Sequence, residues 1–244
     1  MIYAFISDKG LRKNNEDSFY IPDEGDRPVV IVADGMGGHV AGEVASSTAV
    51  DEVVDFIEYA EPGMNSITLL RQAVNAANRR VYEMATTDDR YNGMGTTLVM
   101  ALLTPTKYTA ANIGDSRLYH FDGTKLTRVT RDHSYVQELI SAGLITEEQA
   151  KDHPQRNLIT RVVGTSRFEK ADVGIKSWKR GDILLLCSDG VCGVLDDSTI
   201  ERVFRATGNL LEICDRLHAL SLDNGSTDNI TIVLVKNSEA ENRD

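Results

Sequence analysis

Two stretches of the chain are too apolar to lie at a protein surface, and each leads into an aspartate. Val29–Ala33 is followed directly by Asp34, and Ile183–Cys187 is followed, after Ser188, by Asp189. Short continuous apolar runs of this kind are typical of strands that are buried on both faces. A carboxylate at the end of a buried strand is costly unless it is paired or bound to a cation. The sequence therefore predicts a fold built on buried strands with acidic groups at their ends.

Other segments repeat the strand and helix patterns. Further strands are expected at Ile2–Ile6, Thr96–Leu103, Tyr108–Ile113, Arg117–Phe121, Lys125–Val129 and Ile230–Val235. Several of them follow one another without a helix, and Asp122-Gly123 is a hairpin signal, so much of the pairing should be antiparallel. Apolar residues three or four positions apart predict helices over 41–53, 67–84 and 210–217. These blocks predict the α+β class, with helices outside one or two mostly antiparallel sheets.

The charge of the chain excludes one broad class of partner. The 244 residues include 26 Lys and Arg against 37 Asp and Glu, which gives a formal net charge of −11. Binding to the phosphate backbone of nucleic acids requires a basic face, so no nucleic-acid partner is expected. No apolar run reaches the ~18–20 residues that cross a bilayer, so no membrane partner is expected either. The first residues carry no basic leader, and we expect no signal peptide.

We expect one domain, over residues 1–236, followed by a disordered tail at 237–244. The chain has no internal repeat and no linker-like run. Cys187, Cys192 and Cys214 are an odd number of cysteines, and two of them lie in apolar patterns. They are interpreted as reduced, buried thiols of a cytoplasmic protein, which we expect to be a monomer.

Four aspartates at strand boundaries are the strongest candidates for chemistry: Asp34, Asp115, Asp189 and Asp228. Asp-Gly is also a common turn dipeptide, so a turn alone explains each aspartate taken singly. Turn chemistry does not require buried strands, however, and the set points to a cation site. Carboxylates, a backbone carbonyl freed by a glycine and water are ligands that suit Mg²⁺ or Mn²⁺. There is no CxxC or HExxH motif that would indicate zinc.

Six short motifs occur in a characteristic order along the chain. They are Ser7–Asp17, Ala33–Glu43, Gly95–Thr97, Asn112–Arg117, Cys187–Gly190 and Asp228–Thr231. Together they resemble the bacterial branch of the type 2C metal-dependent protein phosphatases, over about residues 2 to 236. This resemblance implies a four-layer αββα sandwich of two antiparallel sheets flanked by helix pairs. It also implies hydrolysis of phosphoserine and phosphothreonine on proteins, at a centre with two Mn²⁺ or Mg²⁺ ions.

The resemblance also implies a role for each candidate residue. Asp34 would bridge both metal ions, with Asp189 and Asp228 on the first ion and the Gly35 carbonyl on the second. The roles implied for the other candidates are water-mediated contact with the second ion for Glu16, phosphate binding for Arg12, a third metal site for Asp115 together with Asp189, and a place beside the cluster for Asp17. Two cations would activate a bridging water and neutralise the phosphoryl oxygens, and we expect in-line hydrolysis without a phosphoenzyme.

One departure leaves the proton donor unassigned. Many eukaryotic relatives have a histidine at the position of Met36, and methionine cannot donate a proton. His39, a metal-bound water and Asp115 are the alternatives. The segment 134–166 corresponds to a mobile flap near the active site of the relatives, although it could also be a solvated insertion.

Three functional hypotheses follow. The first is an active phosphatase that acts on phosphorylated proteins and opposes a cognate bacterial Ser/Thr kinase. The second is a catalytically inactive relative that only binds phosphoproteins. The third is a phosphatase dedicated to one regulator, such as an anti-sigma antagonist. Loss of metal ligands would indicate the second, and the core matches are all present in this sequence.

Overall fold

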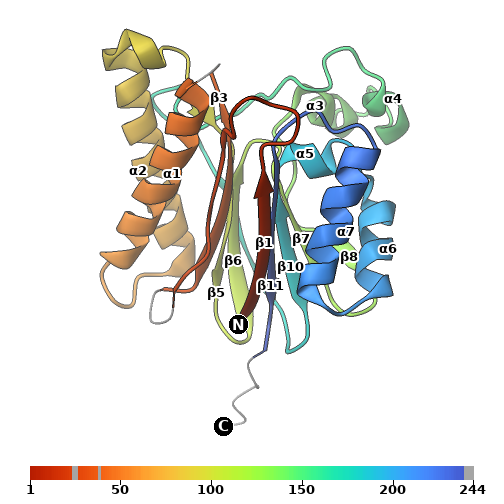
Figure 1. Ribbon diagram of the computed structural model, residues 1–244. Coiled ribbons are helices and arrows are strands. Elements are labelled where there is room, and N and C mark those ends of the chain that lie inside the picture. Colours follow the sequence, from red (N-terminus) through yellow and green to blue (C-terminus); the bar gives the residue numbers. More distant parts are fainter. Residues whose placement is uncertain (24–26, 38–39, 239–244) are drawn as a thin grey trace.

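The computed structural model describes residues 1–23, 27–37 and 40–238. One sheet consists of β1 (Ile2–Asp8), β11 (Ile230–Lys236), β10 (Ile183–Cys187), β7 (Arg117–Phe121) and β8 (Leu126–Arg128), in that order. The other consists of β2 (Asp17–Tyr20), β3 (Val29–Met36), β5 (Leu98–Leu103), β6 (Lys107–Ile113) and β9 (Asp172–Ser177), with the short β4 (Gly95–Thr96) also paired to β3. The two sheets lie face to face (Figure 1), and the strand pairs are antiparallel as predicted.

The apolar run of β3 is explained by two separate cores on its two faces. Val30 and Val32 pack into the core between the sheets, together with Leu184 and Leu186 of β10. The alternate residues of β3, such as Ile31, pack against helices on the outer face. Because side chains alternate across a strand, a strand that is buried on both faces has no polar positions. The predicted buried strands are therefore confirmed.

Helix pairs cover the outer face of each sheet, so the predicted four-layer αββα sandwich is confirmed (Figure 1). α1 (Val40–Glu58) and α2 (Ser66–Thr87) cover the sheet that contains β3. α6 (Asp197–Ala206) and α7 (Leu210–Asp223) cover the other sheet. Ala45 and Ala49 of α1 are fully buried, because small side chains allow close packing of the helix on the sheet.

The structure differs from the sequence expectations at a few elements. β2, β9 and α6 were not expected. The expected strand over 96–103 is interrupted at Thr97, whose hydroxyl accepts a hydrogen bond from the Asp34 backbone N–H at 2.9 Å.

Two smaller predictions are confirmed. The predicted hairpin at Asp122-Gly123 joins β7 to β8, and Gly123 has a φ of 89°. The three cysteines are buried and free, as expected.

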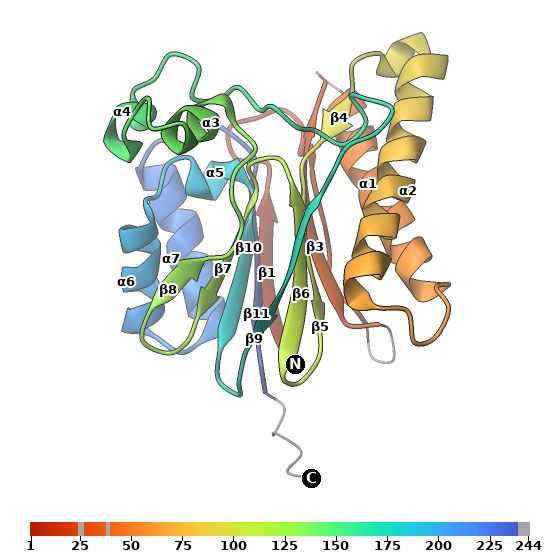
Figure 2. The same ribbon diagram turned by 180° about the vertical axis from the view of Figure 1, so that it is seen from behind.

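The strand ends that carry the aspartates lie at the same end of the sandwich (Figure 1). β3 and β10 end there, β11 begins there, and the short helix α5 (Asp189–Cys192) follows β10 directly. Above them, the segment 134–166 contains α3 (Tyr135–Ser141) and α4 (Glu147–Lys151), as the opposite view shows (Figure 2). In the described part of the chain, no helix has the length and apolar character needed to cross a membrane. The disordered tail expected over 237–244 is wrong at its first residue, because Asn237 is fully buried and its side-chain amide donates to the Pro105 carbonyl oxygen at 2.9 Å. Residues 239–244 lie outside the described residues.

Candidate functional site

Five aspartates converge at this end of the sandwich, although they come from five separate segments. Asp17 begins β2, Asp34 lies in β3, Asp115 lies between β6 and β7, Asp189 begins α5 and Asp228 precedes β11. Asp17 is 7% exposed, and the other four are partly exposed. The structure therefore brings together the four aspartates predicted as metal ligands, with Asp17 beneath them.

The backbone around Asp34 is held rigidly. The Thr97 N–H and the Thr96 hydroxyl both donate to the Asp34 carbonyl oxygen, at 2.8 and 2.9 Å. The next residue, Gly35, donates its N–H to the Glu16 carbonyl oxygen at 3.0 Å. A Cβ added to Gly35 would lie 2.0 Å from the carbonyl oxygen of Gly42, so a side chain is excluded at this position. These contacts fix the positions of the backbone atoms that carry the Asp34 side chain and the Gly35 carbonyl oxygen.

The loop between β1 and β2 brings Arg12 and Glu16 to the same end. Asn229 holds this loop through its side chain: its amide group donates to the Lys9 and Asn14 carbonyl oxygens at 2.9 Å each, and its Oδ1 accepts from the Glu16 N–H at 2.8 Å. The Glu16 carboxylate lies against Gly42 of α1, where an added Cβ would approach its Oε2 to 2.1 Å. Asn229 is thus a positioning residue that sequence reasoning missed.

Arg12 lies beside one of the predicted metal ligands. Its Nη2 is 2.7 Å from Oδ2 of Asp228, and its Nε donates to the Thr227 carbonyl oxygen at 3.3 Å. The Arg12 side chain is 56% exposed, so the guanidinium lies at the mouth of the site and not in its interior. Arg117, which is close in sequence to Asp115, instead pairs with Asp132 at 2.7 Å.

Asp17 is held from below by Ser188. The Ser188 hydroxyl donates to Oδ2 of Asp17 at 2.7 Å and accepts from the Thr231 N–H at 3.0 Å. Asp17 also pairs with Asp34 in the register of β2 and β3. Ser188 therefore links the two sheets under the aspartate cluster. Its place between a buried strand and Asp189 indicated burial of Ser188, but not its contact with Asp17.

The aspartates perturb one another strongly. Burial, followed by the neighbouring charges of Asp17, Asp189 and Asp115, raises the pKa of Asp34 well above its usual value. Burial is also the main reason that the pKa of Asp17 and the pKa of Asp115 are each raised to about 7. Like charges in a desolvated site oppose the ionisation of one another. Such a cluster needs protons or cations to balance it.

The aspartate cluster has the donor chemistry that hard metal ions require. Asp17, Asp115 and Asp189 each have a buried Oδ1 atom without a hydrogen-bond partner among the described residues. Buried carboxylate oxygens are rarely left unpaired, and an all-oxygen donor set suits Mg²⁺ or Mn²⁺. As the side chains stand, no three His, Cys, Asp or Glu residues in the described ranges form a group that could hold a metal ion. The residues fit hard cations by chemistry and proximity, but they are not a preassembled ligand set.

The structure assigns no proton donor at position 36 or position 39. Met36 is 40% exposed at the end of β3 and pairs with Gly95 in β4. Its side chain has no proton to donate. His39 lies outside the described residues.

Comparison with known proteins identifies the family. The model of the protein phosphatase 2C family matches residues 10–223. The Ser/Thr phosphatase stp of Listeria monocytogenes is 36% identical over 237 residues, which cover 95% of this chain and 94% of that protein.

Solved structures agree with this match. The Mycobacterium tuberculosis Ser/Thr phosphatase PstP/Ppp superposes with a TM-score of 0.87 at 38% identity, covering 98% of this chain and 99% of that one. The catalytic domain of PstP in complex with two manganese ions gives a TM-score of 0.84 at 36% identity, covering 96% and 97%. Both the sequence and the fold of this chain are thus those of its relatives along nearly the whole length.

Proposed function

Because the chain belongs to the protein phosphatase 2C family, we propose that it hydrolyses phosphoserine and phosphothreonine on proteins in a metal-dependent reaction. The observation that carries this proposal is the group of five converging aspartates, three of which have an unpaired buried oxygen. A family member that had lost its activity would be expected to have lost such residues. Their presence favours an active phosphatase over a protein that only binds phosphoproteins.

We propose that the residues divide the two metal sites between them. Asp34 would be shared, Asp189 and Asp228 would hold the first ion, and Gly35 would offer its carbonyl oxygen to the second ion, with Glu16 acting through water. The two manganese ions of the related PstP structure support this number. When bound, two divalent cations lower the pKa of water and neutralise charge on phosphoryl oxygens. Mg²⁺ is an equally suitable ion for an all-oxygen site.

Arg12 is proposed to bind the phosphoryl group. Its planar guanidinium presents several donors that match phosphate oxygens, and a charge-assisted pair of this kind is strong. The pairing of Nη2 with Asp228 at 2.7 Å directs the side chain toward the carboxylates. The exposure of Arg12 leaves room for a substrate to approach it. Arg12 would thus orient the phosphate, while the metal ligands supply the electrostatics.

Asp115 is proposed to form a weaker third metal site together with Asp189. One supporting observation is the buried Oδ1 atom of Asp115, which has no hydrogen-bond partner among the described residues. The other is that the negative charge of Asp189 raises the pKa of Asp115, although burial raises it more. Asp115 is also the remaining candidate for the proton donor among the described side chains named above. The two roles require opposite protonation states of one carboxyl group, so they would not be filled at the same time.

The partners are proposed to be phosphorylated proteins and the Ser/Thr kinase that phosphorylates them. Three buried, free cysteines support a reducing compartment such as the cytoplasm. We propose that the protein works there as a monomer, with the segment 134–166 as a flap beside the site. α3 and α4 of this segment lie above the same end of the sandwich as the aspartates (Figure 2).

Hydrolysis of a phosphothreonine peptide with and without EDTA tests this function. We expect release of phosphate in the presence of Mn²⁺, loss of activity with EDTA and recovery when Mn²⁺ is added in excess. Binding of the peptide without hydrolysis under every metal condition would contradict the proposal, and would favour a protein that only binds phosphoproteins.

A further inference from the structure

A groove beside the edge strand β9 collects basic side chains on this acidic protein. The groove has a volume of about 380 Å³ and lies between β9, the end of β6 and residues 129–131. Its basic residues are Arg71 of α2, Arg131, Lys170 and Lys176. We call it the basic groove. With a net charge of −11 for the whole chain, four cations around one hollow are a marked local excess of positive charge.

The cations of the basic groove have few internal partners. Arg71, Lys170 and Lys176 make no hydrogen bond or ion pair with their side chains among the described residues, and Arg131 contacts the Ser141 hydroxyl of α3. The one acidic residue that lines the groove, Asp172, is already engaged by Arg161 at 3.4 Å and by His133 at 3.3 Å. The positive charge of the groove is therefore not neutralised within the described part of the chain.

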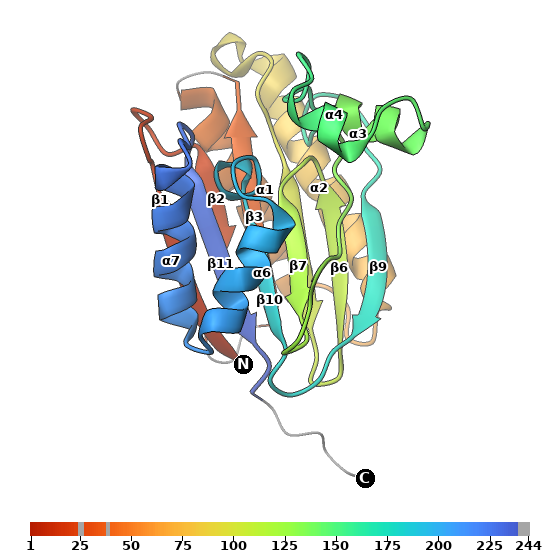
Figure 3. The same ribbon diagram turned by 90° about the vertical axis from the view of Figure 1, so that its right-hand side faces the viewer.

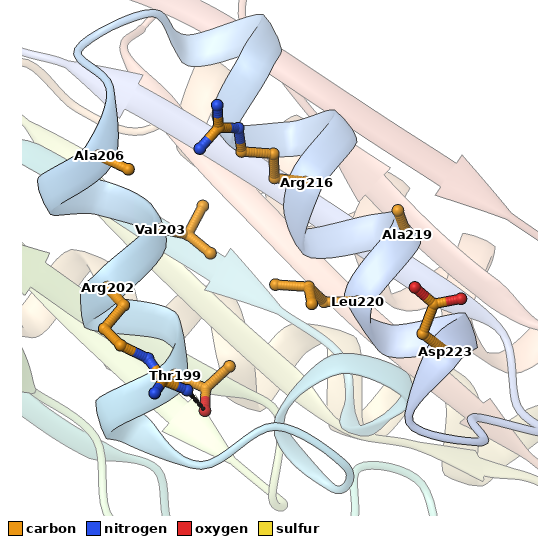
Figure 4. Close-up of a pocket in the computed structure, with 8 residues that line it drawn as sticks. All are labelled: Thr199, Arg202, Val203, Ala206, Arg216, Ala219, Leu220 and Asp223. Atoms are coloured by element: carbon orange, nitrogen blue, oxygen red, sulfur yellow. Dashed lines mark hydrogen bonds between the residues drawn. The ribbon is translucent and has the colours of Figure 1, made fainter.

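Another hollow of the surface provides a contrast. A cavity of about 440 Å³ lies between α6 and α7 and also contains two arginines (Figure 4). Here Arg216 pairs with Glu212, the Nη2 of Arg202 donates to the Thr199 hydroxyl, and Asp223 lines the same cavity. One of its two arginines thus has a carboxylate partner and the lining also includes an aspartate, so its excess of positive charge is smaller than that of the basic groove. Unbalanced charge distinguishes the basic groove.

The shape of the groove suits an extended chain. β9 is the last strand of its sheet and lies at the molecular edge, below α3 and α4 (Figure 3). At Gly174, an added Cβ would meet no atom within 4 Å, so the strand is open on that side. Lys170 and Lys176 are six positions apart, which spans at most about 20 Å in a strand. Cations spread over this length match several negative charges along an extended segment better than a single phosphate.

The groove begins close to the aspartate cluster. Asn112 lines the groove and pairs with Asp172 in the register of β6 and β9. Asp115 follows Asn112 by three residues, so their Cα atoms are at most roughly 10 Å apart. This distance corresponds to about three residues of an extended peptide. A substrate whose phosphorylated residue reaches the aspartate cluster can therefore place residues a few positions away in the basic groove.

We propose that the basic groove binds an acidic stretch of the protein substrate, a few residues from the phosphoserine or phosphothreonine that is hydrolysed. This assignment rests on the proposed phosphatase function for its catalytic consequence. The recognised chemistry is a run of Asp and Glu side chains in an extended segment. Exposed ion pairs are individually weak, so affinity would come from several pairs together and would fall with added salt.

Peptide binding and hydrolysis test the proposal together. The probes are fluorescent phosphothreonine peptides that carry glutamates at three to five positions from the phosphothreonine, on one side or the other, and matched peptides with glutamine. Binding is measured by fluorescence anisotropy in EDTA, and hydrolysis is measured with Mn²⁺. For one of the two placements we expect the glutamate peptide to bind about tenfold more tightly at low salt, with a correspondingly lower KM. The difference should shrink as salt is raised to about 0.5 M.

Charge reversal identifies the groove as the cause. The variant Lys170→Glu with Lys176→Glu should lose the preference for glutamate, while its hydrolysis of p-nitrophenyl phosphate stays that of the wild type. The matched control is Lys125→Glu with Arg202→Glu, which changes the net charge equally at two exposed positions beside the other sheet, outside the groove. The control should keep the preference.

Several outcomes would overturn the proposal. They are equal binding of the glutamate and glutamine peptides by the wild type, a preference that survives in Lys170→Glu with Lys176→Glu, and a preference that disappears equally in the control variant. Tighter binding of a peptide with a second phosphothreonine, without any preference for glutamate, would also overturn the assignment to acidic side chains. Because binding is measured apart from hydrolysis, failure of the phosphatase function would appear separately, as a protein that binds the peptides but releases no phosphate.

Discussion

Arg12 combines an exposed position with a contact to a proposed metal ligand. Its ion pair with Asp228 has a distance of 2.7 Å, but the side chains are 56% and 35% exposed. Exposed ion pairs of this kind contribute about 0–1 kcal/mol to folding. The arginine is therefore not retained for stability, and its proposed role in phosphate binding should be visible in kinetics alone.

Arg12→Ala should lower kcat/KM for a phosphothreonine peptide by roughly 10- to 150-fold, as expected for the loss of a charged hydrogen bond worth about 1.5–3 kcal/mol. Arg12→Lys should recover part of this loss, because it keeps the charge but not the planar pair of donors. The free energy of unfolding, measured with urea, should change by no more than about 1 kcal/mol in either variant. An Arg12→Ala enzyme with unchanged kcat/KM would exclude the phosphate-binding role.

His133 is a buried histidine that joins three parts of the structure. The Nδ1 atom of its imidazole accepts from the Gly114 N–H at 3.2 Å. Its backbone N–H donates to the Gly114 carbonyl oxygen, and its backbone carbonyl oxygen accepts from the Thr160 N–H. Burial lowers the pKa of His133, although its contact with Asp172 acts in the opposite direction. The neutral imidazole is thus the form that the fold favours.

The depressed pKa predicts a pH dependence of stability with a definite sign. An unfolded histidine titrates near 6.5, so the unfolded chain binds this proton before the folded chain does. His133 should therefore favour the folded state fully above about pH 6.5, and this contribution should decline as the pH falls through 6.5 towards the lower folded pKa.

The matched variant is His133→Asn, because the asparagine oxygen can accept from Gly114 but does not titrate. The wild-type free energy of unfolding minus that of His133→Asn should fall between pH 7.5 and pH 5. A difference that rises towards pH 5 would contradict the neutral assignment.

At the residue scale, the aspartates were predictable and their supports were not. Asp34 and Asp189 follow runs so apolar that their burial could be deduced from the sequence. Ser188 and Asn229 are ordinary polar residues, and their importance depends on contacts with Asp17 and with the loop at 9–16, more than 170 positions away in sequence. No local pattern encodes contacts over such separations.

At the scale of elements, a buried ion pair ties β7 to the segment after β8. Arg117 contacts both carboxylate oxygens of Asp132, with its Nη2 at 2.7 Å, and its Nη1 donates to the Cys192 carbonyl oxygen of α5 at 3.2 Å. The side chains of Arg117 and Asp132 are 18% and 9% exposed. The pair therefore lies between the elements that carry Asp115 and Asp189.

Arg117→Met should destabilise the protein by about 3–5 kcal/mol. Among the described residues, it leaves the buried Asp132 carboxylate with only the more distant Arg128 as an ion-pair partner, at 3.8 Å. Combining it with Asp132→Leu should restore more than half of this loss, since a buried pair is often replaceable by apolar residues. Urea unfolding measures both variants. The control is Arg90→Met, which removes an exposed pair with Asp88 and should cost less than about 1 kcal/mol. Equal effects of Arg117→Met and Arg90→Met would show that burial does not matter here.

The elements that sequence analysis missed have weak patterns for physical reasons. β9 is an edge strand with mostly exposed residues, so it lacks the apolar alternation of a half-buried strand. β2 is four residues long and is defined by its pairing with β3. The elements that were predicted correctly, such as β3, β10 and α2, bury a continuous face or a helical stripe, and burial is the property that composition reveals.

At the scale of the whole molecule, the fold concentrates part of its net charge of −11 at one end of the sandwich. Two sheets that are joined by an apolar core direct the ends of β3, β6 and β10 and the start of β11 to the same place. The carboxylates there would repel one another without cations. We propose that this end of the sandwich holds two metal ions and is the phosphatase centre, and metal binding itself tests this proposal.

Calorimetric titration of Mn²⁺ into the wild-type protein and into Asp34→Asn is the most direct test. The wild type should bind two ions per chain, and at free Mn²⁺ about 100-fold above Kd each ion should add about 2.7 kcal/mol to stability, which raises Tm by roughly 5–10 °C. Asp34→Asn, which replaces the shared carboxylate by an amide of the same size, should lose at least one ion and at least about 100-fold in phosphatase activity. An Asp34→Asn protein that binds two Mn²⁺ ions and hydrolyses phosphothreonine at the wild-type rate would contradict the account.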